Sequence, residues 1–204
     1  MRNFFIAVFL MILTQSINAQ QKLTHGILLG AGGGSFSNVE TFISDNNVRR
    51  SLTYKYNLLL GYKLKICDDA KPYFFDMNMS FGIKPYDDYY YRKYDEEETS
   101  GGISAMFHTN NLMLLNLSFN SSFNYKIYKG LYTGIGLTPT IYMNRGTAKK
   151  YAFDIPLSAK IGYDLKFIGI SIGYNYGMLN TLKLNKDYSK GMIREWQAQI
   201  FIPF

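Results

Sequence analysis

The residues of this sequence that could act as an acid, a base or a nucleophile are few and scattered. His25 and His108 are the only histidines. His108 has a hydroxyl at an alternating position, that of Ser104, and a lipid-modifying enzyme could use such a pair. No nucleophile elbow or pair of metal ligands accompanies it, so we expect a loop or rim histidine. Cys67 is the only cysteine, which leaves no partner for an intramolecular disulfide.

Tyrosines and carboxylates are concentrated between positions 86 and 98. The carboxylates could hold Ca²⁺ loosely, but their spacing matches no calcium-binding loop, so a solvated acidic loop is favoured and no metal or other cofactor is predicted. Tyrosine offers a large contact area at a low cost in conformational entropy. We therefore expect this loop to contact an external protein partner, through Tyr86, Tyr89, Tyr90, Tyr91 and Tyr94.

Charged residues also recur on the polar side of alternating segments. Six lysines and four acids follow this pattern: Lys55, Lys63, Lys65, Lys84, Lys126, Lys160, Asp76, Asp154, Asp164 and Glu195. If these segments are strands of one barrel, the ten side chains share its interior, where buried charges are tolerated when they are paired and hydrogen-bonded. An interior ion-pair network is the favoured interpretation, and a narrow polar path or gate is the alternative. Eight strands enclose little more than their own side chains, which argues against a pore.

The elements that must position these groups are β-strands, because apolar and polar residues alternate with a period of two. From Leu52 to Ile66 every even position is apolar or aromatic, and most odd positions are polar, charged or small. A strand sends alternate residues to opposite faces, whereas a helix would mix them. The same alternation recurs in six further segments, residues 73–84, 113–127, 131–143, 153–164, 168–177 and 195–204. A first strand near residues 24–37, in which Gly30 to Gly34 blur the two faces, makes eight.

The connections between these segments alternate in length. Polar stretches near residues 38–50, 87–102, 144–150 and 178–190 are long, whereas the turns near 67–72, 129–130 and 166–167 are short. Long loops at one end and tight turns at the other are typical of outer-membrane β-barrels. An even number of strands also places both ends of the chain on the side of the short turns.

Alternation alone does not say which face meets lipid, since a soluble lipocalin-type carrier would turn the apolar face inward. The polar face is rich in Gly, Ser, Thr and Asn, which can fill a narrow interior, and the apolar face is nearly free of charge for longer than a membrane strand requires. Aromatic residues gather near strand ends, as in interfacial girdles. We therefore expect the apolar face to meet lipid. We expect Trp196 and Phe204 to mark a membrane-insertion strand that the barrel-insertion machinery recognises.

The N-terminus has the pattern of a secretory signal peptide. Arg2 precedes an apolar stretch from Phe4 to Leu13, and a more polar segment then ends at Ala19. The apolar stretch is too short to span a bilayer as a helix. We therefore predict a signal peptide at residues 1–19 and a barrel domain at residues 20–204.

The formal net charge of +7 does not by itself indicate a nucleic-acid partner. No cluster of lysine and arginine is interleaved with stacking aromatics in a recognisable binding motif, so no nucleic-acid binding is predicted. Attraction to the anionic headgroups of outer-membrane lipids explains the excess more simply.

The alternating strands, the stretch Tyr174-Asn175-Tyr176-Gly177 and the last strand ending at Phe204 resemble the small outer-membrane β-barrels common in Bacteroidetes, which include PorT-like proteins and share the OmpA-like eight-stranded form. The resemblance implies an all-β fold, an eight-stranded antiparallel up-and-down transmembrane β-barrel in the cell outer membrane of a Gram-negative bacterium, and carries over no catalytic residue. We expect a non-enzymatic barrel with a structural or interaction role, as an accessory to secretion or envelope organisation. An outer-membrane lipid-modifying enzyme and a soluble periplasmic carrier are the alternatives.

Overall fold

The computed structural model describes residues 21–37, 48–68, 70–92, 108–145, 151–165, 167–179 and 191–204. The expected signal peptide at residues 1–19 lies outside these ranges. In the part of the chain that is described, we find no helix of the length and hydropathy that a membrane span requires.

Eleven strand segments make up one antiparallel sheet. They are β1 (Gln21–Ser37), β2 (Val48–Tyr54), β3 (Asn57–Asp68), β4 (Tyr73–Arg92), β5 (His108–Tyr128), β6 (Leu131–Leu137), β7 (Thr140–Arg145), β8 (Tyr151–Asp154), β9 (Leu157–Asp164), β10 (Gly169–Tyr176) and β11 (Met192–Pro203).

Three pairs of segments continue one another, so the eleven segments form eight strands. β2 runs into β3, β6 into β7 and β8 into β9, each across a gap of two residues. Proline explains the interruptions, because it cannot donate a ladder hydrogen bond. Pro139 and Pro156 occupy the second and third gaps, and Pro85 of β4 lies opposite the first, where it accepts from the Lys55 amide at 3.1 Å.

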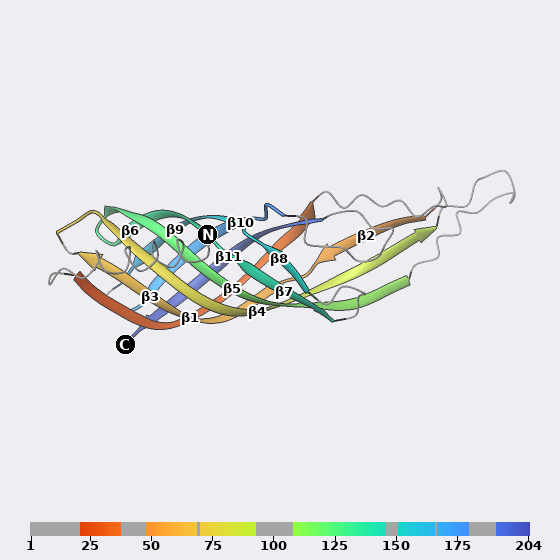
Figure 1. Cartoon of the computed structure of the whole chain (residues 1–204), viewed down its shortest axis with the longest axis horizontal. Coiled ribbons are helices and arrows are strands. Elements are labelled where there is room, and N and C mark those ends of the chain that lie inside the picture. The colour runs from red at the N-terminus through yellow and green to blue at the C-terminus, as the bar shows by residue number, and fades with distance from the viewer. Residues whose placement is uncertain are drawn as a thin grey trace, which may run out of the picture.

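The sheet closes on itself through its first and last strands. β1 pairs with β11 from Gly26 opposite Pro203 to Ser37 opposite Met192. The other side of β1 pairs with β3, and the β4–β5 ladder extends from Tyr73 opposite Tyr125 to Tyr90 opposite His108. The predicted fold, an eight-stranded antiparallel barrel, is therefore confirmed, and Figure 1 shows its strands tilted around a long body.

Tight turns lie at one end of the barrel, which we call the turn end. There β5 and β6 are joined by Lys129 and Gly130, whose φ angles are 34° and 94°. Two positive φ angles belong to the hairpin turn whose twist matches the flanking strands. Gln21 and Phe204 also lie at this end, since Gln21 pairs with Asp68 and Phe204 donates to the carbonyl of His25. The opposite end is called the loop end.

At the loop end, β2, β4 and β5 project beyond the rest of the wall (Figure 1). The sequence places a loop from residue 87 onward, but β4 continues to Arg92 and pairs with β2 on one side and β5 on the other. The loop boundary was wrong because the run of tyrosines and aspartates was interpreted as irregular structure. A ladder on both sides keeps these residues in a strand.

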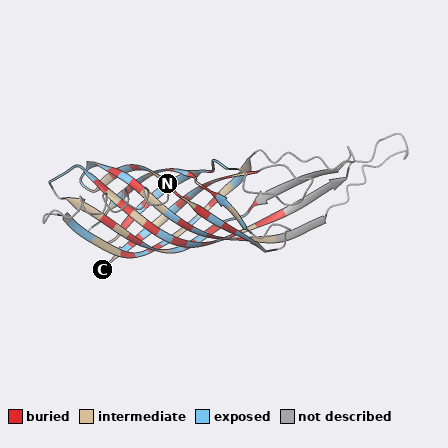
Figure 2. Cartoon of the chain, in the orientation of Figure 1, coloured by how far each residue is buried: buried red, intermediate tan, exposed pale blue. Residues whose placement is uncertain are grey.

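Burial alternates along the strands, as Figure 2 shows, and most of the large hydrophobic side chains are on the exposed face. Among the buried residues that the structure describes, polar and charged side chains outnumber hydrophobic ones by nearly two to one. The two buried hydrophobic clusters lie inside the barrel: Leu28, Leu59 and Phe201 form one, and Tyr54, Tyr86, Leu114, Tyr142 and Ile193 form the other. The glycines of β1 make room for the first cluster, since a Cβ at Gly30 would come within 2.8 Å of Leu59.

One strand departs from the predicted alternation. Tyr54 was expected on the lipid face and Lys55 in the interior, but Tyr54 is buried and Lys55 is exposed. Between Tyr54 opposite Tyr86 and Leu58 opposite Ile83, β2–β3 has three residues where β4 has two. This extra residue is a β-bulge, which reverses the phase of everything on its loop side.

Candidate functional site

The interior of the barrel is filled in layers, and the first lies at the turn end. Lys65 forms an ion pair with Asp164. The Lys65 ammonium also lies 4.1 Å from the centre of the Phe74 ring and 5.6 Å from the centre of the Tyr132 ring. The two rings meet edge-on, with their centres 5.1 Å apart. The Tyr132 ring lies across Gly162, where a side chain would collide with it. Two aromatic rings and an ion pair thus close this end.

The second layer is centred on Asp76, a fully buried carboxylate. It accepts from Lys63 at 2.9 Å and from Lys160 at 2.7 and 2.8 Å, and the Ser122 hydroxyl also donates to it. Ion pairs with this many hydrogen bonds are the form in which charges are tolerated in an interior. Because two lysines share one carboxylate, the layer carries a net positive charge.

A small polar cavity of about 40 Å³ separates the charged layers. Amide and hydroxyl groups line it, and Asn120 donates to Thr138 at 2.7 Å and to Ser158 at 3.1 Å. The cavity has room for a few water molecules. Asn116 Oδ1 also borders this space and accepts no hydrogen bond from the residues described.

The third layer gathers around Glu195. Lys84 donates to this carboxylate at 2.6 Å. The Tyr54 hydroxyl also donates to it, at 3.0 Å. Gln197 donates at 2.8 Å, and Asn175 and Asn57 complete the shell at 3.3 and 3.4 Å. The second hydrophobic cluster, with Tyr86 and Tyr142 at its centre, then fills the interior toward the loop end.

Seven of the ten predicted interior charges therefore meet in three groups, and three do not. Lys55 is exposed and forms a surface ion pair with Asp87 at 2.9 Å. Lys126 donates to the carbonyls of Asp68 and Lys71 at the turn end, both at 3.4 Å. Asp154 is buried but accepts from the backbone amides of residues 155, 178 and 179 rather than from a lysine.

The tyrosines predicted to contact a partner are divided by the structure. Tyr86 is buried in the second hydrophobic cluster, so its predicted exposure in a loop is wrong. Tyr89, Tyr90 and Tyr91 belong to the projecting part of β4. Tyr94 lies outside the described residues.

The described residues do not show the candidate catalytic pair of His108 and Ser104. His108 begins β5 opposite Tyr90, but its side chain and Ser104 both lie outside what is described. His25 hydrogen-bonds Tyr62 at 2.8 Å and meets the Phe204 ring edge-on at 5.1 Å on the outer surface. Across the described ranges, no group of His, Cys, Asp and Glu is arranged to hold a metal ion.

Sequence reasoning missed the aromatic closures and one outward cation. Phe74 and Tyr132 occupy positions that alternation assigns to the polar, inward face of their strands. Large aromatic residues at inward positions were the signal in the sequence that the interior is plugged. Arg194 shares the phase of Trp196 and therefore points outward, where it lies against Tyr176. Trp196 and Phe204 are both exposed on the outer face, as their phase predicts.

No family model matches the chain, and no curated protein sequence matches it. Among solved structures, it is similar to Ail, the attachment invasion locus protein of Yersinia pestis, with 10% identity, coverage of 90% of this chain and 99% of that chain, and a TM-score of 0.47. It is also similar to the outer membrane protease OmpT from Escherichia coli, with 9% identity, coverage of 90% of this chain and 96% of that chain, and a TM-score of 0.32. The translocator domain of the autotransporter NalP from Neisseria meningitidis is similar with 10% identity, coverage of 100% of this chain and 96% of that chain, and a TM-score of 0.30. All three TM-scores are below 0.5, so we draw on these likenesses for neither function nor location. The resemblance to PorT-like barrels stays a prediction.

Proposed function

We propose that this chain is a non-enzymatic outer-membrane β-barrel of a Gram-negative bacterium, with a structural or interaction role as an accessory to secretion or envelope organisation. The observation that carries the proposal is the inverted distribution of side chains. Large hydrophobic residues such as Leu60, Ile135 and Ile172, which are 59%, 66% and 61% exposed, cover the outside, while paired charges fill the inside.

The exposed apolar surface is far larger than a soluble monomer tolerates. The outward residues of β5 illustrate it: Leu117, Phe119, Phe123, Tyr125 and Ile127 are all exposed. Every strand contributes a similar row, whereas the largest apolar patch of a soluble monomer covers about 300–600 Å². A closed barrel satisfies its backbone hydrogen bonds internally, which is what a bilayer demands of a β-structure.

A soluble carrier of the lipocalin type would need the opposite arrangement. Its ligand would require an apolar interior, whereas the central cavity here holds only about 40 Å³ and is lined mainly by polar and charged side chains. The charged layers around Asp76 and Glu195 border this cavity on either side. These features favour a membrane barrel with a filled interior.

Fractionation combined with heat-modifiable gel mobility tests the proposal. The chain expressed with its N-terminal segment should be recovered from the outer-membrane fraction only with detergent, and its unheated form should migrate differently from its boiled form. Recovery in the soluble periplasmic fraction without detergent would refute it.

We further propose that the projecting part of β4, with Tyr89, Tyr90 and Tyr91, contacts an external protein partner. Supporting this is a sheet of three strands that extends past the barrel wall, held by the register from Tyr54 opposite Tyr86 to Val48 opposite Arg92 (Figure 1). A strand whose backbone is paired on both sides before binding loses less conformational entropy when a partner binds.

Replacing Tyr89, Tyr90 and Tyr91 by Ser should abolish co-purification of the partner and leave the heat-modifiable mobility intact. Tyr128→Ser is the matched control, because Tyr128 is 64% exposed at the opposite rim. Equal co-purification with the triple variant and the control would rule out this surface.

A further inference from the structure

An arginine lies on the outer face of the barrel close to the loop end. Arg194 stands directly opposite Tyr176 in the β10–β11 ladder. Its guanidinium carbon lies 4.6 Å from the centre of the tyrosine ring, and Nη2 donates to the tyrosine hydroxyl at 3.0 Å. The ring fixes the guanidinium and the tyrosine hydroxyl accepts from one of its five donors, so the other Nη donors are left for a ligand.

This cation has no carboxylate partner in the described part of the chain. Arg194 is partly buried, and its Nε–H is shielded from solvent and donates to none of the described residues. Its neighbour on β1 is Ser35, an exposed residue with another hydroxyl donor. A planar guanidinium beside two hydroxyls matches the oxygens of a phosphate, which arginine binds in a bidentate manner.

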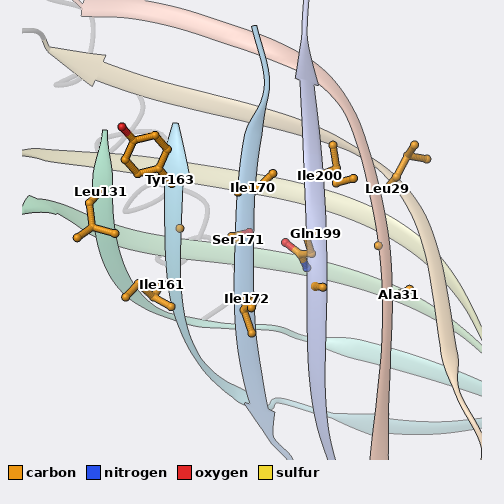
Figure 3. Close-up of a pocket in the computed structure, with 13 residues that line it drawn as sticks. Leu29, Ala31, Leu131, Ile161, Tyr163, Ile170, Ser171, Ile172, Gln199 and Ile200 are labelled. Carbon is orange, nitrogen blue, oxygen red and sulfur yellow. The ribbon is translucent and has the colours of Figure 1, made fainter. Parts of the chain in front are cut away.

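Below Arg194, toward the turn end, the same strands carry an aromatic row and then an apolar groove. Trp196 and Tyr174 are paired and exposed, and the indole lies against Gly33, where a Cβ would come within 3.2 Å of Nε1. One row further, Ala198 lies between Ala31 and Ile172. The alanines leave a depression of about 610 Å³, lined by residues of β1, β6, β9, β10 and β11 (Figure 3).

The spacing of the cation and the groove suits a single lipid. Ala198 follows Arg194 by four residues, which is about 13 Å along a strand. The headgroup region of one leaflet is roughly 5–8 Å thick, so an arginine at headgroup level places the groove within the hydrocarbon. At that level an outward arginine costs little, whereas at the bilayer centre it would cost about 2–4 kcal/mol.

We infer that β1, β10 and β11 form a binding site for one phosphate-bearing lipid of the leaflet at the loop end. Arg194, with Tyr176 and Ser35, binds the phosphate, and the groove at Ala31 and Ala198 receives an acyl chain. The inference rests on the proposed membrane location of the barrel. Charge complementarity and continuity along the same strands favour an anionic lipid over a zwitterionic one or a second copy of the chain.

The only tryptophan of the chain, Trp196, lies next to this site, so its fluorescence reports lipid contact there. The full chain is refolded into phosphatidylcholine vesicles that contain equal mole fractions of either brominated phosphatidylglycerol or brominated phosphatidylcholine. One basic residue near a membrane surface contributes enough for about a fivefold preference for the anionic lipid. We expect quenching to show that preference, and Arg194→Gln to reduce it to none.

Lys129→Gln is the matched control. It removes the same charge from a cation that lies 5.1 Å from the centre of the Tyr128 ring at the opposite rim, and it should retain the preference. Ala198→Phe fills the groove and should weaken the preference, while Ser121→Phe on the outward side of β5 should not. Equal quenching by both lipids in the wild type, or a preference unchanged by Arg194→Gln, would overturn the site.

Two further outcomes separate the alternatives. Loss of the preference in inorganic phosphate, but not in chloride of equal ionic strength, would mean that the site takes free phosphate and would overturn the lipid assignment. A barrel that fails to insert shows neither quenching by any brominated lipid nor a heat-modifiable band. That result refutes the proposed function, whereas equal quenching of an inserted barrel refutes only the lipid site.

Discussion

At the residue scale, the interior depends on one carboxylate that forms ion pairs with two lysines. Asp76 is fully buried and accepts from Lys63 and Lys160 at 2.7–2.9 Å, together with the Ser122 hydroxyl. Removing one partner of a buried ion pair leaves an uncompensated charge, which costs far more than the pair itself contributes. Asp76→Asn should therefore lower the free energy of unfolding by about 3–5 kcal/mol. Urea unfolding in lipid vesicles measures this change.

The pair between Asp68 and the exposed Lys71 at the turn end provides the control. Its atoms are 3.4 Å apart and the Lys71 side chain is 45% exposed. Surface pairs contribute at most about 1 kcal/mol, so Asp68→Asn should change the unfolding free energy little. Replacing Lys160 by Met in the Asp76→Asn variant should restore part of the loss. Equal effects of Asp76→Asn and Asp68→Asn would mean that the interior charges are solvated.

At the scale of the elements, alternation assigned the two faces of seven strands, and six of them have the predicted phase along their whole length. For example, Phe153, Leu157 and Ile161 point outward and Asp154 and Ser158 inward, as their spacing requires. The phase fails only beyond the β-bulge near Lys55. Its cause, Pro85, stands on the neighbouring strand, so the bulge becomes visible only when the register between the two strands is known.

The partners within each charged layer could not be predicted for the same reason. Phase places Lys84 and Glu195 on one face of the sheet, but they are 111 residues apart and meet across the lumen. Strand tilt and stagger decide which levels coincide, and a single sequence does not contain them. The contact between Arg194 and Tyr176 does not depend on tilt across the lumen. It follows from the register between two consecutive strands, β10 and β11.

At the scale of the whole molecule, two separate closures block the lumen of the described barrel. The Phe74 and Tyr132 rings lie with Lys65 at the turn end, and Tyr86 and Tyr142 lie beyond the Glu195 layer at the loop end. The cavity between them holds about 40 Å³, which is enough for a few water molecules but makes no continuous path. The charged layers therefore act as structural filling between two aromatic plugs.

Two plugs in series predict how conductance in planar bilayers responds to mutation. The wild-type barrel should show no steady conductance, because eight strands leave an interior that side chains fill. Phe74→Ala with Tyr132→Ala opens only the turn end, and Tyr86→Ala with Tyr142→Ala opens only the loop end, so neither double variant should conduct. Only the quadruple variant should, once its heat-modifiable mobility shows that it is folded. Conductance in either double variant would mean that one closure alone seals the lumen, and steady conductance in the wild type would contradict a plugged barrel.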